Sequence, residues 1–128
     1  MQIRVYYEDT DVGGIVYHSN YLNFCERARS EFFFKQDMLP IMDDAHFVVR
    51  KIECDFLKSA KFGDLIEVSS KIIEIKKSSL KIYQEITKDN DKLFTATFLL
   101  LLIKDGKIKR IDENIKNKLL SLFIPPKR

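Results

Sequence analysis

Residues 20–36 read NYLNFCERARSEFFFKQ, and this stretch decides the fold. Its apolar side chains recur at the i, i+3, i+4 spacing that forms one face of an α-helix. The residues predicted to form this buried face are Tyr21, Phe24, Cys25, Ala28 and Phe32. The opposite face is polar and holds Glu26, Arg27, Ser30, Glu31 and Lys35. The stretch therefore predicts one long amphipathic helix, with Ser19 or Asn20 as its N-cap.

The segments on both sides of this helix have the composition of β-strands. Residues 2–7 (QIRVYY) are rich in β-branched and aromatic residues and predict a short strand that ends at Tyr7. After Pro40 the apolar pattern changes from a helical to an alternating period, clearest in Leu80, Ile82, Gln84 and Ile86. This pattern predicts strands over 46–56, 65–75, 79–88 and 93–104, joined by turns at 76–77, 89–91 and 105–106.

The order of these elements indicates an α+β domain in which an antiparallel sheet curls around the long helix. Asp112 is expected to cap a short last helix over 113–122, which ends before Pro125 and Pro126. At 128 residues the chain is expected to form one domain over 1–128. The run from Phe98 to Ile103 is apolar at odd and even positions, so both of its faces need cover, and this favours an oligomer.

Composition limits the classes of protein that the sequence allows. The chain is 45% hydrophobic and 32% charged, with a formal net charge of +3 and lysines spread along its length, which does not favour nucleic-acid binding. Because it shows neither a signal peptide nor an apolar run of about 20 residues, we expect a cytoplasmic protein without a transmembrane segment. Cys25 and Cys54 are expected to be core residues, since their spacing fits no CxxC motif.

Residues 9–19, DTDVGGIVYHS, gather two acids, two glycines and a histidine just before the helix. A calcium loop starting at Asp9 would need oxygen ligands at positions held by Gly13 and Asn20, so no metal is expected. These residue types also suit a sharp turn, and that alternative stays open. Because motifs for serine hydrolases, zinc proteases and nucleotide loops are missing, a hydrolase of this sequence would have to use a carboxylate or a histidine, without a cofactor.

Position favours a chemical role for Asp11. A helix N-terminus keeps a nearby carboxylate ionised, and its free N–H groups can also hold the oxyanion that forms when a carbonyl is attacked. Gly13 and Gly14 would let the backbone approach a substrate without a Cβ in the way.

Residues 9–29, DTDVGGIVYHSNYLNFCERAR, with the preceding VYYE, resemble the signature of the 4-hydroxybenzoyl-CoA thioesterase family, and in particular its branch associated with the Tol–Pal cell-envelope system. Residues 55–64, DFLKSAKFGD, resemble a second family segment. The resemblance implies a hotdog fold, homodimers or tetramers with a continuous sheet, and hydrolysis of an acyl-CoA thioester. It also implies that Asp11 is the catalytic aspartate and that the backbone N–H of His18 polarises the carbonyl. Tyr7 is a candidate for orienting the carboxylate or a water.

Asp11 could act as a nucleophile, through a mixed anhydride, or as a general base toward water. The second segment contains Lys58, Ser59 and Lys61, which could meet the phosphates of CoA or could form a solvated basic turn. One alternative function is a hotdog dehydratase acting on acyl chains attached to a carrier protein, and the position of the histidine before the helix disfavours it. The other is a module of the cell-envelope machinery that binds acyl-CoA or an acyl carrier protein without catalysis, which Asp11 disfavours.

Overall fold

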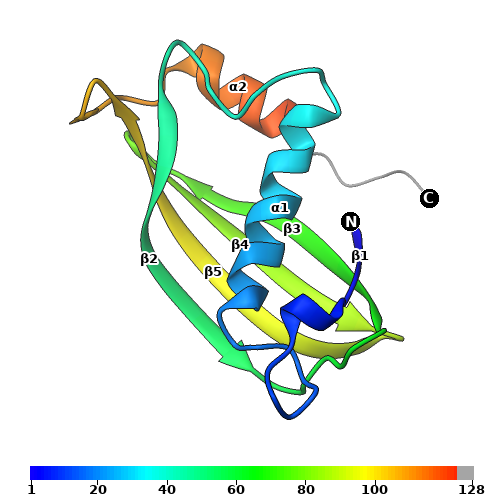
Figure 1. Ribbon diagram of the computed structural model, residues 1–128. Coiled ribbons are helices and arrows are strands. Elements are labelled where there is room, and N and C mark those ends of the chain that lie inside the picture. The colour runs from blue at the N-terminus through cyan, green and yellow to red at the C-terminus, as the bar shows by residue number, and fades with distance from the viewer. Residues whose placement is uncertain (124–128) are drawn as a thin grey trace.

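The computed structural model describes residues 1–123, so Pro125 and Pro126 lie outside the described residues. One long helix lies across a curled antiparallel sheet of six strands (Figure 1). The strand order is β1-β3-β4-β5-β2, and β6 pairs with the end of β5. In chain order the elements are β1 (Gln2–Arg4), the 3-10 turn η1 (Tyr7–Asp9), α1 (Asn20–Phe34), β2 (His46–Phe56), β3 (Leu65–Ile75), β4 (Ser79–Lys88), β5 (Asp91–Lys104), β6 (Lys107–Ile108) and α2 (Glu113–Leu122).

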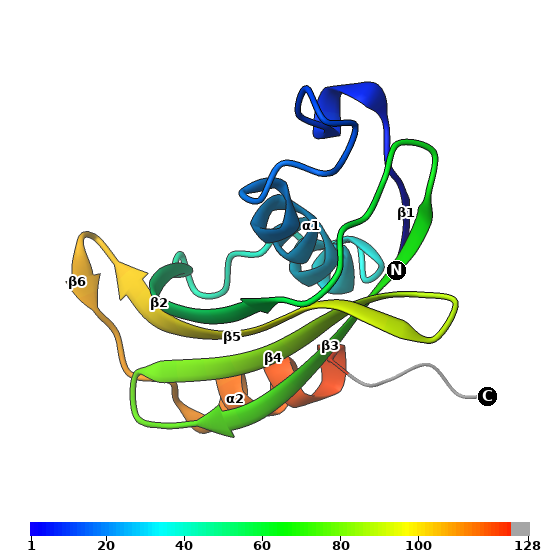
Figure 2. The same ribbon diagram turned by 90° about the horizontal axis from the view of Figure 1, so that it is seen from below.

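The core lies between α1 and the concave face of the sheet, and Figure 2 shows the sheet curving beneath the helix. Alternate residues of β4 and β5 point toward α1 and are buried, as the period of two predicted. The fully buried large side chains of these two strands are Leu80, Ile82, Gln84, Ile86, Phe94, Phe98 and Leu102. Register shifts in β2, at Val49/Lys51, and in β3, at Ile72/Glu74, add local twist that helps the sheet to curl. The predicted helix wrapped by a curled sheet is therefore confirmed.

The helix differs from the prediction at three places. It ends at Phe34, with Lys35 as C-cap, instead of continuing to Gln36. Ser19 is the N-cap residue, but its backbone is already helical (φ −70°, ψ −20°) and its side chain caps no backbone N–H. Phe33 is buried, while Phe32 is only partly buried and stacks on Phe123 with ring centroids 4.4 Å apart. In the last turn of α1 two neighbouring rings, Phe32 and Phe33, therefore contact the end of α2. The predicted single apolar face does not extend to this turn.

The predicted first strand was too long. β1 ends at Arg4, and Tyr7 belongs to η1, because the Asp9 carboxylate accepts a hydrogen bond from the backbone N–H of Tyr6 (2.9 Å) and closes a 3-10 turn. The strand predicted from Leu93 begins two residues earlier, at Asp91. β6 adds a short hairpin after the predicted turn at Asp105–Gly106.

The second helix follows the sequence closely. Asp112 caps it by accepting a hydrogen bond from the backbone N–H of Ile115 (2.9 Å), as predicted. Ile115 and Leu119 are buried, and Phe123 lies against Phe32 and Phe33 at the end of α1. Neither of the helices within residues 1–123 is long and apolar enough to cross a lipid bilayer.

Strand β2 forms an edge of the sheet, and no other strand of the described chain pairs with its outer side. Val49, Ile52 and Phe56 lie opposite Leu100, Phe98 and Phe94, so they share the face that α1 covers elsewhere. On β2 this face is open, and the three side chains are 45%, 36% and 53% exposed. An unpaired edge strand with exposed apolar side chains is a typical site for a partner strand.

Candidate active site

The loop before α1 is a tight turn built around Asp11. The backbone carbonyl of Asp11 accepts from the N–H of Gly14 (3.0 Å), and its N–H donates to the carbonyl of Ile15 (2.9 Å). The carboxylate Oδ1 accepts from the N–H of Gly13 (2.8 Å). Gly14 has a positive φ of 79°, which a residue with a Cβ adopts only with strain. These bonds fix both the backbone and the carboxylate of Asp11.

Asp9 connects this loop to the start of α1. The residue is 8% exposed, and its carboxylate accepts the hydrogen bond from Tyr6 described above. Its backbone carbonyl accepts from the N–H of Tyr17 (2.9 Å) and from the side-chain amide of Asn20 (2.9 Å). Asp9 therefore supports the turn and joins it to the start of α1. Asn20, the first residue of α1, therefore bonds to this loop through its side-chain amide. Its side-chain oxygen accepts a hydrogen bond from the amide of Asn23 (3.0 Å).

The loop is also tied to the segment that follows β2. Val16 donates its N–H to the carbonyl of Ala60 (2.9 Å), and Ile15 forms an isolated antiparallel bridge with Lys61. The Asp11 loop and residues 57–59 consequently form two walls of one cavity of about 280 Å³. Its lining residues are Asp11, Ile15, Val16, His18, Tyr21, Phe56, Leu57, Lys58 and Ser59. The fold therefore brings four sequence-predicted site residues together: Asp11, His18, Lys58 and Ser59.

His18 lies two residues before the first residue of α1, at the end of the helix where N–H groups are free. Its imidazole is exposed and packs against the rings of Tyr17, 4.4 Å away, and Phe56, 6.3 Å away between centroids. Within residues 1–123 its backbone N–H has no hydrogen-bond acceptor. A residue with a free backbone donor and a residue with an exposed carboxylate thus line the same cavity, and attack on a carbonyl uses these two kinds of group.

Tyr21 and Phe56 are lining residues that sequence reasoning did not place in the site. The hydroxyl oxygen of Tyr21 accepts a hydrogen bond from the backbone N–H of Ala60 (3.0 Å), and its ring stacks on Phe94. Burial raises the pKa of the Tyr21 hydroxyl, so the phenol stays neutral. The helical pattern identified Tyr21 as buried, but the hydrogen bond to residue 60 depends on a contact between segments far apart in the sequence.

Four other predicted site residues do not line this cavity. Tyr7 is 75% exposed, and its ring lies 5.9 Å from that of Phe62. Gly13 and Gly14 shape the turn, since the first leaves room for the Asp11 carboxylate and the second supplies the positive φ. Lys61 lies in an adjoining cavity of about 240 Å³.

The adjoining cavity is lined by equal numbers of lysine and aspartate side chains. Lys58 and Ser59 line both cavities, so the two are neighbours. Lys58 pairs with Asp91 (3.5 Å), and Lys88 pairs with Asp64 (2.9 Å). Asp64 also accepts from the backbone N–H of Lys61 (2.8 Å). Of these three lysines, only Lys61 lacks an ion pair among the described residues.

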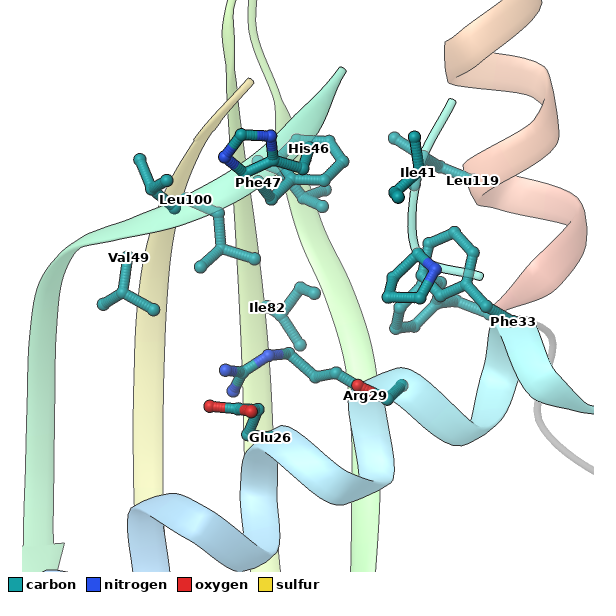
Figure 3. A pocket seen from close by; sticks show the side chains of 15 residues that line it. Glu26, Arg29, Phe33, Ile41, His46, Phe47, Val49, Ile82, Leu100 and Leu119 are labelled. Atoms are coloured by element: carbon teal, nitrogen blue, oxygen red, sulfur yellow. The ribbon is translucent and has the colours of Figure 1, made fainter. Parts of the chain in front are cut away.

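A larger cavity of about 540 Å³ lies farther along α1, beneath the chain that leads into β2 (Figure 3). Phe33, Ile82, Leu100 and Leu119 give it apolar walls, and Ile41 and His46 lie at its rim. Glu26 and Arg29 extend from α1 toward it. It shares no lining residue with the Asp11 cavity. Its size and mainly apolar lining are those of a small-molecule pocket.

Arg29 is held by a buried hydrogen-bond network. Its Nη1 donates to Oε1 of Gln84 (2.8 Å), and its guanidinium carbon lies 4.3 Å from the ring centroid of Phe98. Gln84 is fully buried, and its amide donates to the carbonyl of Cys25 and to the hydroxyl of Ser70 (2.9 Å each). Burial lowers the pKa of Arg29, but the guanidinium remains charged at neutral pH. A glutamine at an inward position of the β4 alternation was the sequence signal of this network.

Cys25 is buried in the core, as predicted, whereas Cys54 is only partly buried and packs against the core. Both thiols are free. Burial raises the pKa of Cys25 to about 12 and also raises that of Cys54, so neither is a ready nucleophile. Within residues 1–123 no group of three or more His, Cys, Asp or Glu side chains is arranged to hold a metal ion.

A single long helix cradled by a six-stranded antiparallel sheet defines the hotdog fold, and the expected fold class is confirmed. In this fold the carboxylate loop, the helix start and the segment after β2 surround one cavity. Residues 13–95 match the family model of the thioesterase superfamily, and the chain belongs to this superfamily.

Several relatives of known name are similar to the chain. "Acyl-CoA thioesterase YbgC" of Helicobacter pylori is 52% identical over 86 residues, which cover 67% of this chain and 65% of that protein. The alignment thus spans slightly less than two thirds of the relative. A protein of the same name from Haemophilus influenzae is 37% identical over 113 residues, covering 85% of this chain and 83% of the relative. A probable thioesterase from Bartonella henselae superposes with a TM-score of 0.81 and 32% identity, covering 88% of this chain and 97% of that structure.

Proposed function

We propose that this chain hydrolyses acyl-CoA thioesters in the cavity lined by Asp11 and His18. One observation carries the proposal: Asp11, which is exposed, and His18, whose backbone N–H has no acceptor within residues 1–123, line the same cavity. Thioester hydrolysis needs an anion that attacks or activates water, and a donor for the developing oxyanion. The activity named for the relatives from Helicobacter pylori and Haemophilus influenzae supports this choice.

In the proposed reaction the thioester carbonyl oxygen accepts a hydrogen bond from the N–H of His18. Asp11 then follows one of two routes. As a general base it removes a proton from water, whose oxygen attacks the carbonyl carbon and expels CoA as its thiolate. As a nucleophile its own oxygen attacks, CoA leaves, and water cleaves the resulting mixed anhydride. Both routes require the ionised carboxylate, and both end with a free acid and a thiol.

Lys58, Ser59 and Lys61 are proposed to meet the phosphates of CoA. The position of Lys58 and Ser59 at the border between the Asp11 cavity and its neighbour supports this role. A phosphate would compete with Asp91 for Lys58, whose ion pair is exposed and therefore weak. The predicted role of Tyr7 in orienting the carboxylate requires its exposed ring to leave Phe62 and turn toward Asp11.

The working unit is proposed to be a homodimer joined through β2. Two copies of this edge strand, paired antiparallel, would extend the sheet across both chains and cover Val49, Ile52 and Phe56. Such a pair places the start of one β2 beside the end of the other. The 540 Å³ cavity, which includes His46 and Val49, would then adjoin the partner's Asp11 cavity, which includes Phe56. The acyl group is proposed to extend across this boundary into the larger cavity.

The experiment is a panel of acyl-CoAs, with release of the CoA thiol followed by absorbance. Wild type should release thiol from at least one aliphatic or aromatic acyl-CoA, and Asp11→Asn should not. If both proteins release no more than buffer, the hydrolase proposal fails, and retention of an acyl-CoA in equilibrium dialysis would favour the binding module. Formation of a conjugated enoyl product from a 3-hydroxyacyl thioester would favour the dehydratase. Light scattering of the same sample should give the mass of a dimer or of a tetramer built from two dimers.

The finer assignments rest on the sequence resemblance. They are a role in lipid metabolism beside the Tol–Pal cell-envelope system, a cytoplasmic location, and either CoA or an acyl carrier protein as the thiol carrier. A 4-hydroxybenzoyl substrate belongs to the same set and enters the panel as one of its aromatic members. Comparing each acyl group on CoA and on a purified carrier protein separates the two carriers, because only the accepted thiol is released at a rate that depends on Asp11.

A further inference from the structure

The face of the sheet opposite α1 carries a third cavity, of about 780 Å³, on the outer side of β4 and β5. Lys81 and Leu99 lie directly opposite each other there, between residues that face the helix. The lining residues of this cavity are Arg50, Glu74, Lys76, Lys77, Ser78, Ser79, Lys81, Leu99, Leu101 and Ile108, and we call them the outer-face patch. The patch shares no lining residue with the Asp11 cavity or with the 540 Å³ cavity.

The patch has an excess of positive charge. Its one carboxylate, Glu74, lies 3.6 Å from Lys76 and 3.9 Å from Lys81. Arg50 and Lys77 form no ion pair with any of residues 1–123. Four cations against one anion give the lining residues a formal net charge of about +3.

The fold adds further cations at one end of the patch. The backbone N–H of Ile111 donates to the carbonyl of Lys77 (2.6 Å), so the chain after β6 lies beside the turn between β3 and β4. This chain and the β5–β6 hairpin contain Lys104, Lys107, Lys109 and Arg110, which outnumber the acids Asp105 and Asp112. Lysines that are dispersed in the sequence are thus collected at one end of the molecule.

The floor of the patch is apolar. Leu99 and Leu101 are partly buried, and Ile108, which pairs with Ile103 in the β5–β6 hairpin, is 61% exposed. No aromatic side chain lines the patch, although aromatic stacking is the usual means of holding single-stranded nucleic acids. Cations around exposed aliphatic side chains instead match a bilayer interface, where phosphodiester headgroups surround acyl chains.

We propose that the outer-face patch docks the protein on an anionic phospholipid bilayer. Headgroup phosphates contact Arg50, Lys76 and Lys77, and Ile108 enters the interface beside them. In the dimer proposed above, antiparallel pairing of β2 is symmetric about an axis normal to the sheet, so both patches face the same way and can meet one membrane. This last step rests on the proposed dimer, and a single patch also binds without it.

The test is co-sedimentation of the full chain with vesicles of pure phosphatidylcholine and with vesicles of an equimolar phosphatidylcholine–phosphatidylglycerol mixture. Wild type should bind only the anionic vesicles, and added salt should release it. Each basic residue near such a surface contributes a factor of about five, so Lys76→Gln with Lys77→Gln should lower the partition coefficient about 25-fold. Ile108→Ser should weaken binding without changing its salt dependence. The control is Lys35→Gln, which removes an exposed cation on the helix side of the sheet.

Three results would overturn the proposal. The first is equal binding to neutral and anionic vesicles, or binding to neither. In the second, the lysine double variant partitions as wild type does. In the third, the double variant changes the mass by light scattering and leaves vesicle binding unchanged, which would make the patch a contact between dimers. Thiol release from dispersed acyl-CoA by each variant is measured in parallel, and because the patch is remote from Asp11 it should stay at the wild-type rate. Failure of membrane docking is thereby distinguished from failure of the proposed hydrolase.

Discussion

The carboxylate Oδ1 of Asp11 lies 2.8 Å from the backbone nitrogen of Gly13, and a Cβ built on Gly13 would lie 3.2 Å from the same oxygen. The hydrogen bond directs the carboxylate, and the missing side chain leaves room for it. Gly14 has a different task, because a Cβ there would meet no atom within 4 Å but its φ is +79°. Gly13 is therefore needed for the position of the carboxylate, and Gly14 is needed for the backbone conformation of the turn.

Alanine substitution of each glycine should give opposite results. Gly13→Ala has no positive φ to maintain and should change stability little, but its Cβ displaces the carboxylate, so kcat should fall by at least about tenfold, since sub-ångström placement matters in catalysis. Gly14→Ala should lower the free energy of unfolding by about 1 kcal/mol because of the left-handed backbone. Urea unfolding and thiol-release rates measure the two effects. A Gly13→Ala enzyme with wild-type kcat would show that this contact does not position the carboxylate.

Asp11→Asn removes the charge but retains an oxygen that can accept from Gly13. We expect thiol release to fall at least about 100-fold, the low end for loss of a general base, with a free energy of unfolding within about 0.5 kcal/mol of wild type. Adding His18→Ala to this variant should cost little more, because alanine keeps the backbone N–H that is proposed to hold the carbonyl oxygen. A further large loss of thiol release in the double variant would mean that the imidazole of His18 also takes part in the reaction.

Sequence periodicity predicted the elements well because local chemistry decides most of them. The apolar alternation placed β3 and β4 at their observed bounds, and the Asp112 cap set the start of α2. The predicted bounds and buried faces were wrong where a contact between neighbouring elements, or a short polar turn, outweighed the secondary-structure propensity of the residues. Tyr7 is aromatic and suited to a strand, but the Asp9 carboxylate closes a turn around it. Phe33 is buried because α2 packs against the end of α1.

The site was predictable where it lies in one segment. Asp11 and His18 follow each other closely in the sequence, and both line the cavity. The contribution of Tyr21 depends on Ala60, and that of Arg29 depends on Gln84, in each case a residue from a distant segment. Pairing of this kind leaves little trace in a single sequence. Gln84, a polar residue within the apolar alternation of β4, was the one sign in the sequence of such a contact.

Stability should depend on pH through Asp64. Burial alone would raise the pKa of this carboxyl, but hydrogen bonds from Lys88 and from the backbone N–H of Lys61 outweigh burial and lower it. A carboxyl with a lowered folded-state pKa stabilises the fold fully above its unfolded pKa of about 3.9, and the contribution is lost as the pH falls through the folded value. The difference in urea midpoint between wild type and Asp64→Asn should therefore be constant from about pH 7 to pH 5 and shrink below about pH 4. A difference that grows on acidification would contradict the lowered pKa.

Tyr21→Phe tests the bond that joins the helix start to the segment after β2. The variant keeps the ring on Phe94 but leaves the buried N–H of Ala60 without its acceptor, which should cost about 1–3 kcal/mol of unfolding free energy. Tyr17→Phe is the matched control, because Tyr17 is 47% exposed and its hydroxyl bonds to none of residues 1–123. Equal effects of the two changes in chemical denaturation would show that the Ala60 bond is not a stabilising contact.

The 540 Å³ cavity, if it holds the acyl group, should set the chain length that the enzyme accepts. Ile41 lines this cavity from the loop before β2, whereas Leu39, on the same loop and 65% exposed, does not. Ile41→Trp should fill part of the cavity and lower kcat/KM for long acyl-CoAs by about 10-fold or more, while short ones react nearly as before, because the ring removes space that only a long chain uses. Leu39→Trp adds the same side chain outside the cavity and should leave the chain-length profile unchanged. A uniform loss across all chain lengths in Ile41→Trp would place the acyl group elsewhere.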